Sequence, residues 1–153
     1  MRSIFVILLI SPLIGSATIG KSIKVPDNDS TLQTLITRSV LQQTNNELRD
    51  NVWWVPIPGK PLQATKTSVN TGGKIYTTYD FTLTSGKSNC VRNAVSYSSI
   101  SRCSIDPKYS DRQICKVSLA WTERDFNTIE METYCTTQTQ SAFPKSNSFP
   151  TRN

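Results

Sequence analysis

Apolar residues recur at helical spacing between residues 32 and 48, and Gln, Thr, Arg and Asn stand between them. This period predicts an amphipathic helix of about five turns. Ser30 and Gln33 have the form of a capping box, in which a hydroxyl and an amide bond the first free N–H groups. We therefore expect one helix that begins at Ser30 and ends near Asp50 and Asn51. The apolar positions are Leu32, Leu35, Ile36, Val40 and Leu48.

After this helix the pattern changes to that of β-strands. Val52–Val55 begins an extended stretch, which Pro and Gly residues interrupt before residues 62–69 resume it. The segment Asn70–Gly73 predicts a turn, because Asn and Gly accept positive φ. Residues 75–83 then alternate in polarity, as expected for a half-buried strand. The predicted buried face of that strand is made of Ile75, Tyr79, Phe81 and Leu83.

Residues 86–112 are rich in Ser, Asn, Arg and Lys and carry no sustained period. We expect an irregular excursion here, held by a disulfide between Cys90 and Cys103. Trp53 and Trp54 lie in the extended stretch that begins at Val52, and as neighbours in a strand they point to opposite faces of it. One ring is expected to pack on the helix, and the other to be either exposed or covered by the excursion.

The last two strands predict how the cysteines pair. Folding the alternating segments into an antiparallel hairpin about Asp125 sets Trp121 opposite Ile129 and Cys115 opposite Cys135. Directly opposed cysteines in a non-hydrogen-bonded pair lie near the spacing that a disulfide requires. Of the three possible pairings, the pattern therefore favours Cys115–Cys135, which leaves the two cysteines of the excursion to pair with each other.

The composition narrows the chemistry of this chain of 153 residues, which is the size of one domain. The absence of histidine excludes Ser-His-Asp and Cys-His catalytic pairs and His-rich zinc sites. The four cysteines form no CxxC pair, so we expect disulfides rather than metal ligation. We predict a protein that is not an enzyme and needs no metal or cofactor. Its 17 basic and 11 acidic residues are spread along the sequence, so neither nucleic acid nor a membrane is expected as a partner.

The first residues have the parts of a secretory signal peptide. Arg2 supplies a positive charge, residues 4–10 form an apolar run, and small residues precede a cleavage site after Ala17. The run is too short to span a bilayer, and no second apolar stretch follows it. We therefore expect a secreted, extracellular protein. The expected boundaries are residues 1–17 for the signal peptide, 18–136 for the folded domain and 137–153 for a flexible tail.

A signal peptide, one long helix and antiparallel strands with two sequential disulfides resemble the secreted, two-disulfide (type 2) cystatins. The most specific element is the separation of 20 between Cys115 and Cys135, which looks identical to that of the family's second disulfide. Gly73–Tyr76 also resembles the Gly-x-x-Tyr segment that leaves the family's first inhibitory hairpin. The resemblance implies an α+β fold in which a curved antiparallel sheet wraps one long helix. It also implies inhibition of papain-like cysteine proteases of the cathepsin type.

Inhibitors of this family fill the protease cleft with a wedge of three parts: an N-terminal arm with a glycine, a Gln-x-Val-x-Gly hairpin and a Pro-Trp hairpin tip. Here Gly20 would belong to the arm, and the first tip keeps only the glycine of its motif. The second tip has no Pro-Trp, and the nearest tryptophan, Trp121, lies on the disulfide face. The implied protease-binding residues are Gly20, Val69, Asn70, Thr71, Gly72, Gly73, Trp121, Glu123 and Arg124.

These departures leave a second interpretation open, in which the fold is kept and inhibition is lost. The chain would then be a non-inhibitory, cystatin-like binding or immunomodulatory protein with another secreted or cell-surface partner. For Trp121, the core-facing parity favours packing opposite Ile129 over contact with a protease. Some family members inhibit legumain through an Asn after the helix, and the nearest counterpart here is Asp50.

Two further expectations concern modification and assembly. Asn28 begins an Asn-Asp-Ser sequence, which predicts N-glycosylation in a secreted chain. The resemblance implies a monomer or a domain-swapped dimer, because cystatin folds can exchange the helix and the first strand between chains.

Overall fold

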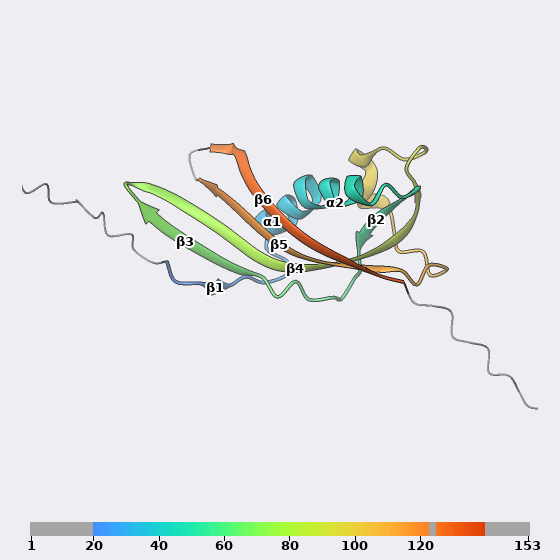
Figure 1. Ribbon diagram of the computed structural model, residues 1–153, viewed down its shortest axis with the longest axis horizontal. Helices are drawn as coiled ribbons and strands as arrows, with labels where there is room; N and C mark the ends of the chain where they lie inside the picture. The colour runs from blue at the N-terminus through green and yellow to red at the C-terminus, as the bar shows by residue number, and fades with distance from the viewer. Residues whose placement is uncertain (1–19, 123–124, 140–153) are drawn as a thin grey trace, which may run out of the picture.

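The structure is a computed structural model that describes residues 20–122 and 125–139. The predicted signal peptide, residues 1–17, lies outside these ranges, as do residues 123–124 and 140–153. The chain forms an α+β fold in which one helical rod packs against an antiparallel sheet (Figure 1). The predicted α+β class is therefore confirmed at this level.

The helical rod is capped by Asp29 rather than by Ser30. The Oδ1 atom of Asp29 accepts the N–H of Leu32 at 2.8 Å. The side chain of Gln33 instead donates to the carbonyl of Asp27. The predicted capping box is therefore wrong, because the helix begins one residue earlier than its pattern requires, with Asp29 at the cap and Ser30 already helical. The rod consists of α1 (Ser30–Leu35), a π-helical segment η1 (Ile36–Val40) and α2 (Leu41–Leu48).

All strands of the sheet pair antiparallel, in the order β1-β3-β4-β5-β6. The long strand β4 pairs with β3 over its first part and with β2 over its last part. The prediction for residues 86–112 is therefore corrected, because β4 extends to Val91 and the irregular part, around a short 3-10 helix, is residues 92–111. The strand bounds are β1 (Ile23–Lys24), β2 (Val52–Pro56), β3 (Thr65–Thr71), β4 (Lys74–Val91), β5 (Arg112–Thr122) and β6 (Asp125–Gln138).

The inner face of the sheet packs on the helical rod and forms the main core. Tyr79, Phe81 and Leu83 of β4 are each 4% exposed or less, as the alternation predicted. Burying side chains of this size contributes about 1.5–3 kcal/mol each. Ile75 was expected on the same buried face but is 36% exposed. It lies near the tip of the β3–β4 hairpin, which extends past the rod (Figure 1).

Both predicted disulfides are present. Cys115 lies directly opposite Cys135 in the β5–β6 ladder, with a Cα–Cα distance of 4.0 Å. Cys90 and Cys103 are joined farther along β4 in the same direction, seven residues beyond the Leu83 that pairs with Cys115, with a Cα–Cα distance of 5.7 Å. Strand parity therefore predicts the pairing of all four cysteines correctly.

The predicted pairing of Trp121 with Ile129 is wrong. Ala120 pairs with Glu130, but the next pair joins Thr122 to Asp125. Four residues of β6, 126–129, therefore lie opposite the single residue Trp121, and such a bulge bends the strand locally. The simple hairpin register predicted from the sequence holds only up to Ala120.

The irregular segment 92–111 covers Trp53, as one of the two alternatives predicted. Trp53 is 7% exposed, and its Nε1 donates to the carbonyl of Val95 at 2.7 Å. The guanidinium of Arg92 lies 4.3 Å from the Trp53 ring centroid. The Tyr97 and Trp53 rings pack in a T-shaped arrangement, with their centroids 5.5 Å apart. Burial raises the pKa of Tyr97 to about 12, so its hydroxyl stays protonated.

An ion cluster ties the end of the rod to this same region. Lys87 Nζ lies 3.1 Å from the carboxylate of Asp50 and 2.9 Å from that of Asp111. Burial raises the pKa of Asp50, but hydrogen bonds from Lys87, Trp54 and the N–H of Asn51 outweigh it and hold the pKa below its ordinary value. We call residues 50–54 and 87–111, which contain this cluster and the Cys90–Cys103 disulfide, the stapled end.

Candidate functional site

The hairpin of β3 and β4 ends in a two-residue glycine turn. Thr71 pairs with Lys74, so Gly72 and Gly73 alone connect the strands. Their φ angles of 58° and 75° lie in the left-handed region, as a type I′ hairpin turn requires. An L side chain at either position would be strained. The turn predicted at Asn70–Gly73 is confirmed and is formed by its two glycines.

The second hairpin ends beside the first. Thr122, the last residue of β5, lies opposite Tyr76 of β4 on one side and Asp125 of β6 on the other. Gly73 stands three positions before Tyr76, so the first turn extends about 10 Å past the end of β5, at about 3.3 Å per residue. Both hairpins therefore end at the same end of the sheet (Figure 1).

Gly20 lies against the first hairpin. A Cβ atom added to Gly20 would stand 1.7 Å from the carbonyl oxygen of Ser68, so only glycine fits at this position. The contact continues along β1, where Ile23 pairs with Lys66. From Ile23 back to Gly20, the N-terminal arm therefore runs along β3 toward the glycine turn.

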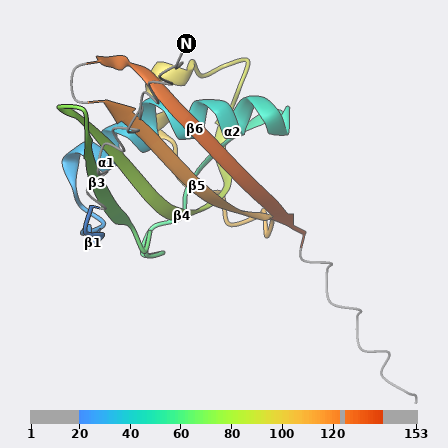
Figure 2. The ribbon, with the colours of Figure 1, turned by 60° about the vertical axis from the view of Figure 1, so that its left-hand side comes forward.

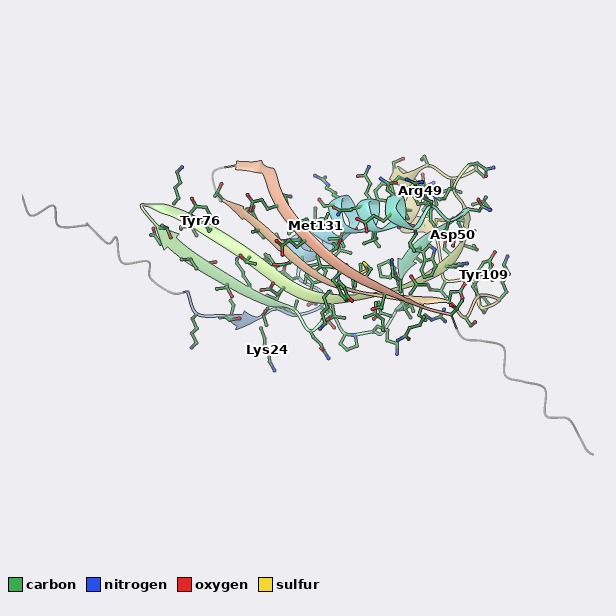
Figure 3. All side chains as sticks on the ribbon, viewed as in Figure 1. Lys24, Arg49, Asp50, Tyr76, Tyr109 and Met131 are labelled. Atoms are coloured by element: carbon green, nitrogen blue, oxygen red, sulfur yellow. A yellow bond between two sulfur atoms is a disulfide. The ribbon has the colours of Figure 1, made fainter. Side chains whose placement is uncertain are left out.

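We call the surface formed by Gly20, residues 69–76 and Thr122 the turn end. Its tip is polar, because residues 70–74 contribute Asn, Thr, Gly and Lys and are all exposed. Two apolar side chains stand directly behind it: Ile75 is 36% exposed and Tyr76 is 44% exposed. Figure 3 shows Tyr76 at this extremity of the sheet. Sequence reasoning did not name Ile75 or Tyr76 as site residues, although their places directly after the turn were a signal.

The structure brings Gly20 and the predicted tip residues 69–73 together, but it places Trp121 elsewhere. Trp121 is 7% exposed, and its ring stacks on Tyr79 with centroids 5.1 Å apart and planes 9° apart. Its aromatic surface is therefore used in the core, because its parity in β5 points it to the inner face. Glu123 and Arg124, the predicted midpoint of the second tip, lie outside the described residues.

Two other predicted positions lie away from the turn end. Asn28 is exposed in the turn before the rod, where its side chain is accessible for glycosylation. Asp50, the nearest counterpart of a legumain-contacting Asn, is held by Lys87 and by the indole N–H of Trp54. Its carboxylate therefore belongs to the stapled end.

The turn end offers contact area and hydrogen bonds rather than reactive groups. Lys74 and Tyr76 are its ionisable side chains, and they form no nucleophile–base pair. Among residues 20–122 and 125–139, no group of three or more His, Cys, Asp or Glu side chains could hold a metal ion. Within the same ranges, no helix is long and apolar enough to cross a membrane.

Comparisons with protein-family models, with curated proteins and with solved structures find no match to this chain.

Proposed function

We propose that this protein is a secreted, cystatin-like inhibitor of papain-like cysteine proteases, which occludes the active-site cleft with the turn end. The observation that supports the proposal is the placement of three separate segments at one end of the sheet. Gly20, the Gly72–Gly73 turn and the end of the β5–β6 hairpin come together there. A wedge of the cystatin type needs these three segments in one row.

Occlusion of this kind depends on shape. The glycine turn lets the backbone approach an enzyme surface closely, because it carries no side chain. Seven residue pairs of the β3–β4 ladder, from Thr65–Asp80 to Thr71–Lys74, hold the turn in place, so little ordering entropy is lost on docking. Ile75 and Tyr76 supply exposed apolar area beside the tip, and Tyr is among the residues that most often contribute strongly to interfaces.

The test is inhibition of papain and of a cathepsin L-type protease by the full chain without residues 1–17. We expect reversible inhibition, competitive with a small peptide substrate, at or below micromolar protein. The Gly73→Asn variant keeps a residue that tolerates positive φ but adds a side chain to the tip, and we expect about tenfold weaker inhibition. Gly59→Asn is the matched control, because Gly59 also has a positive φ of 74° and lies outside the turn end. Absence of inhibition at micromolar protein contradicts the proposal.

A second candidate is a cystatin-like protein that binds a secreted or cell-surface partner without inhibiting proteases. The burial of Trp121 favours it, because the tryptophan nearest the second hairpin's end is stacked in the core instead of at a tip. The double variant Val69→Gln with Thr71→Val separates the two candidates. Inhibition by this variant, when the parent chain does not inhibit, would identify the native tip as a non-inhibitory one.

A further inference from the structure

The last strand of the sheet, β6, has one paired edge and one free edge. It spans 14 residues and pairs with β5, and it stands at the end of the strand order. Among the described residues no strand pairs with its other side. Figure 2 shows β6 as the outermost strand, crossing in front of the helical rod. A row of backbone N–H and C=O groups along such an edge can pair with another extended chain.

Two hollows lie between this free edge and the rod. The first has a volume of about 400 Å³; its apolar side is formed by Leu35, Trp121 and Ile129, and Arg38 is the one charged residue that lines it. The second has a volume of about 640 Å³ and contains Met131, with polar side chains of the rod and the charged Glu47 and Arg49 around it. Ser39 lines both hollows, so they follow each other along the rod. Met131 is labelled on β6 in Figure 3.

The β6 residues that line the two hollows have the spacing of alternate side chains in an extended peptide. Ile129 and Met131 are two positions apart on β6 and both pack against the main core, so both point to the inner face. A strand added to β6 would also direct every second side chain to this face. Two such side chains, about 7 Å apart, would lie beside Ile129 and Met131, the β6 residues of the two hollows.

The charges along β6 indicate which peptide fits. The strand contains Asp125, Glu130 and Glu132 and no Lys or Arg, although the whole chain has a net charge of +6. Glu130 and Glu132 are exposed between the inward-pointing residues of β6. Neither forms an ion pair with a side chain in the described part of the chain. Opposite charges on directly paired positions of neighbouring strands stabilise the pairing.

We propose that the free edge of β6 binds an extended basic peptide by adding it to the sheet as a further strand. Alternate Lys or Arg side chains of the peptide pair with Glu130 and Glu132 on the outer face. The side chains that alternate with them face inward: an apolar one enters the Ile129 hollow, and a polar or long unbranched one enters the Met131 hollow. A second copy of this chain fits poorly, because antiparallel pairing about Met131 sets Glu130 opposite the other copy's Glu132.

The probe is a short peptide of alternating Lys and Leu in which one central Leu is replaced by Gln. It is acetylated, amidated and labelled with a fluorophore, and it is mixed with the full chain without residues 1–17. We expect saturable binding by fluorescence anisotropy and amide chemical-shift changes centred on β6. Methylating every second backbone nitrogen of the peptide in one frame removes the N–H groups that face β6 and should abolish binding. Methylation in the other frame should leave binding intact, a pattern that charge attraction alone does not produce.

Single variants test the charge pairing. Glu130→Gln and Glu132→Gln are each expected to weaken binding about threefold. Asp80→Asn is the matched control, because Asp80 is an exposed carboxylate on the outer face of β4 and should leave binding unchanged. Equal binding of a peptide with Glu in place of Lys, equal effects of both methylation frames, or shifts centred on β1 would overturn the proposal. A dimer that forms through β6 and excludes the peptide would overturn it as well.

Discussion

The two ends of the sheet are built in different ways. The stapled end has a disulfide, a buried tryptophan under Arg92 and the Asp50–Lys87–Asp111 ion cluster. The turn end has a β-ladder and three glycines, and among its described residues there is no disulfide and no ion pair. Contacts that stabilise the fold are therefore concentrated away from the surface proposed to bind. This separation lets the exposed side chains of the turn end, such as those of Thr71 and Tyr76, change at little cost to the fold.

The largest expected effect comes from removing Trp53 at the stapled end. Trp53→Ala should lower the free energy of unfolding by about 3–5 kcal/mol, because it leaves a cavity in a packed site. The variant also loses the hydrogen bond to Val95 and the contact with Arg92. Urea unfolding of the full chain measures the change. Tyr76→Ala, at the turn end, is the comparison and should cost less than about 1 kcal/mol, as for exposed positions in general. Similar losses in the two variants would refute the difference between the ends.

Removing the disulfide of the stapled end has the next largest effect. The double variant Cys90→Ser with Cys103→Ser should lose about 3 kcal/mol, because the bridge no longer restricts the unfolded chain. Thermal unfolding followed by circular dichroism, with and without a reductant, checks this value. Inhibition or other binding through the turn end should persist at temperatures where the variant is folded. Loss of binding in the folded variant would mean that the two ends are coupled.

A smaller effect is expected at the glycine turn. Gly73→Ala should cost about 1–2 kcal/mol, because Gly73 has a φ of 75° that L residues rarely adopt. Hydrogen exchange should show the loss as faster exchange in β3 and the first part of β4. The exchange rates of β2 should not change. Thr71→Ala, one position before the turn, is the control without backbone strain.

The smallest effect is the pH dependence of the ion cluster. The folded-state pKa of Asp50 lies below its ordinary value of 3.8, so the unfolded chain binds the proton more readily. The stabilisation is therefore fully present above about pH 4 and is lost as the pH falls through the lowered folded-state pKa. Urea unfolding at a series of acidic pH values should show a shallower fall for Asp50→Asn than for the parent. Parallel curves would show that Asp50 does not contribute to the acid sensitivity.

Local patterns predicted the helix, both hairpins and the disulfides. The Cys115–Cys135 pairing was accessible because it depends only on strand parity and on the position of one turn. The start of the helix was predicted at Ser30, but the cap was assigned one residue late. Neighbouring residues with similar capping preference compete, and geometry decides between Asp29 and Ser30.

The end of β4 was missed because its buried residues are small and polar. Ser85 and Ser88 are 1% exposed or less, yet their hydroxyls give no hydrophobic alternation along the sequence. Pairing with β2, which is distant in the sequence, makes this part of the chain a strand. The bulge opposite Trp121 was missed for a related reason, since residues 126–129 carry no Gly or Pro to mark it.

The turn end itself could be predicted only in pieces. The residues of each hairpin predict its own turn. The placement of the two hairpin ends side by side depends on the pairing of Tyr76 in β4 with Thr122 in β5, which belong to different hairpins. The exposure of Ile75 likewise depends on where the rod ends relative to the sheet, which the period of β4 does not encode. Long-range pairing therefore decides which residues of the candidate site come together.

The Gly72–Gly73 connection also makes the molecule a practical carrier for foreign sequences. Its flanking residues, Thr71 and Lys74, are exposed and lie past the main core, so a longer loop inserted between them would disturb no packed side chain. Loop closure grows only slowly in cost with length, by about 0.6 kcal/mol for each doubling. Libraries of randomised peptides displayed at this point should therefore remain folded, which would turn the protein into a source of new binders.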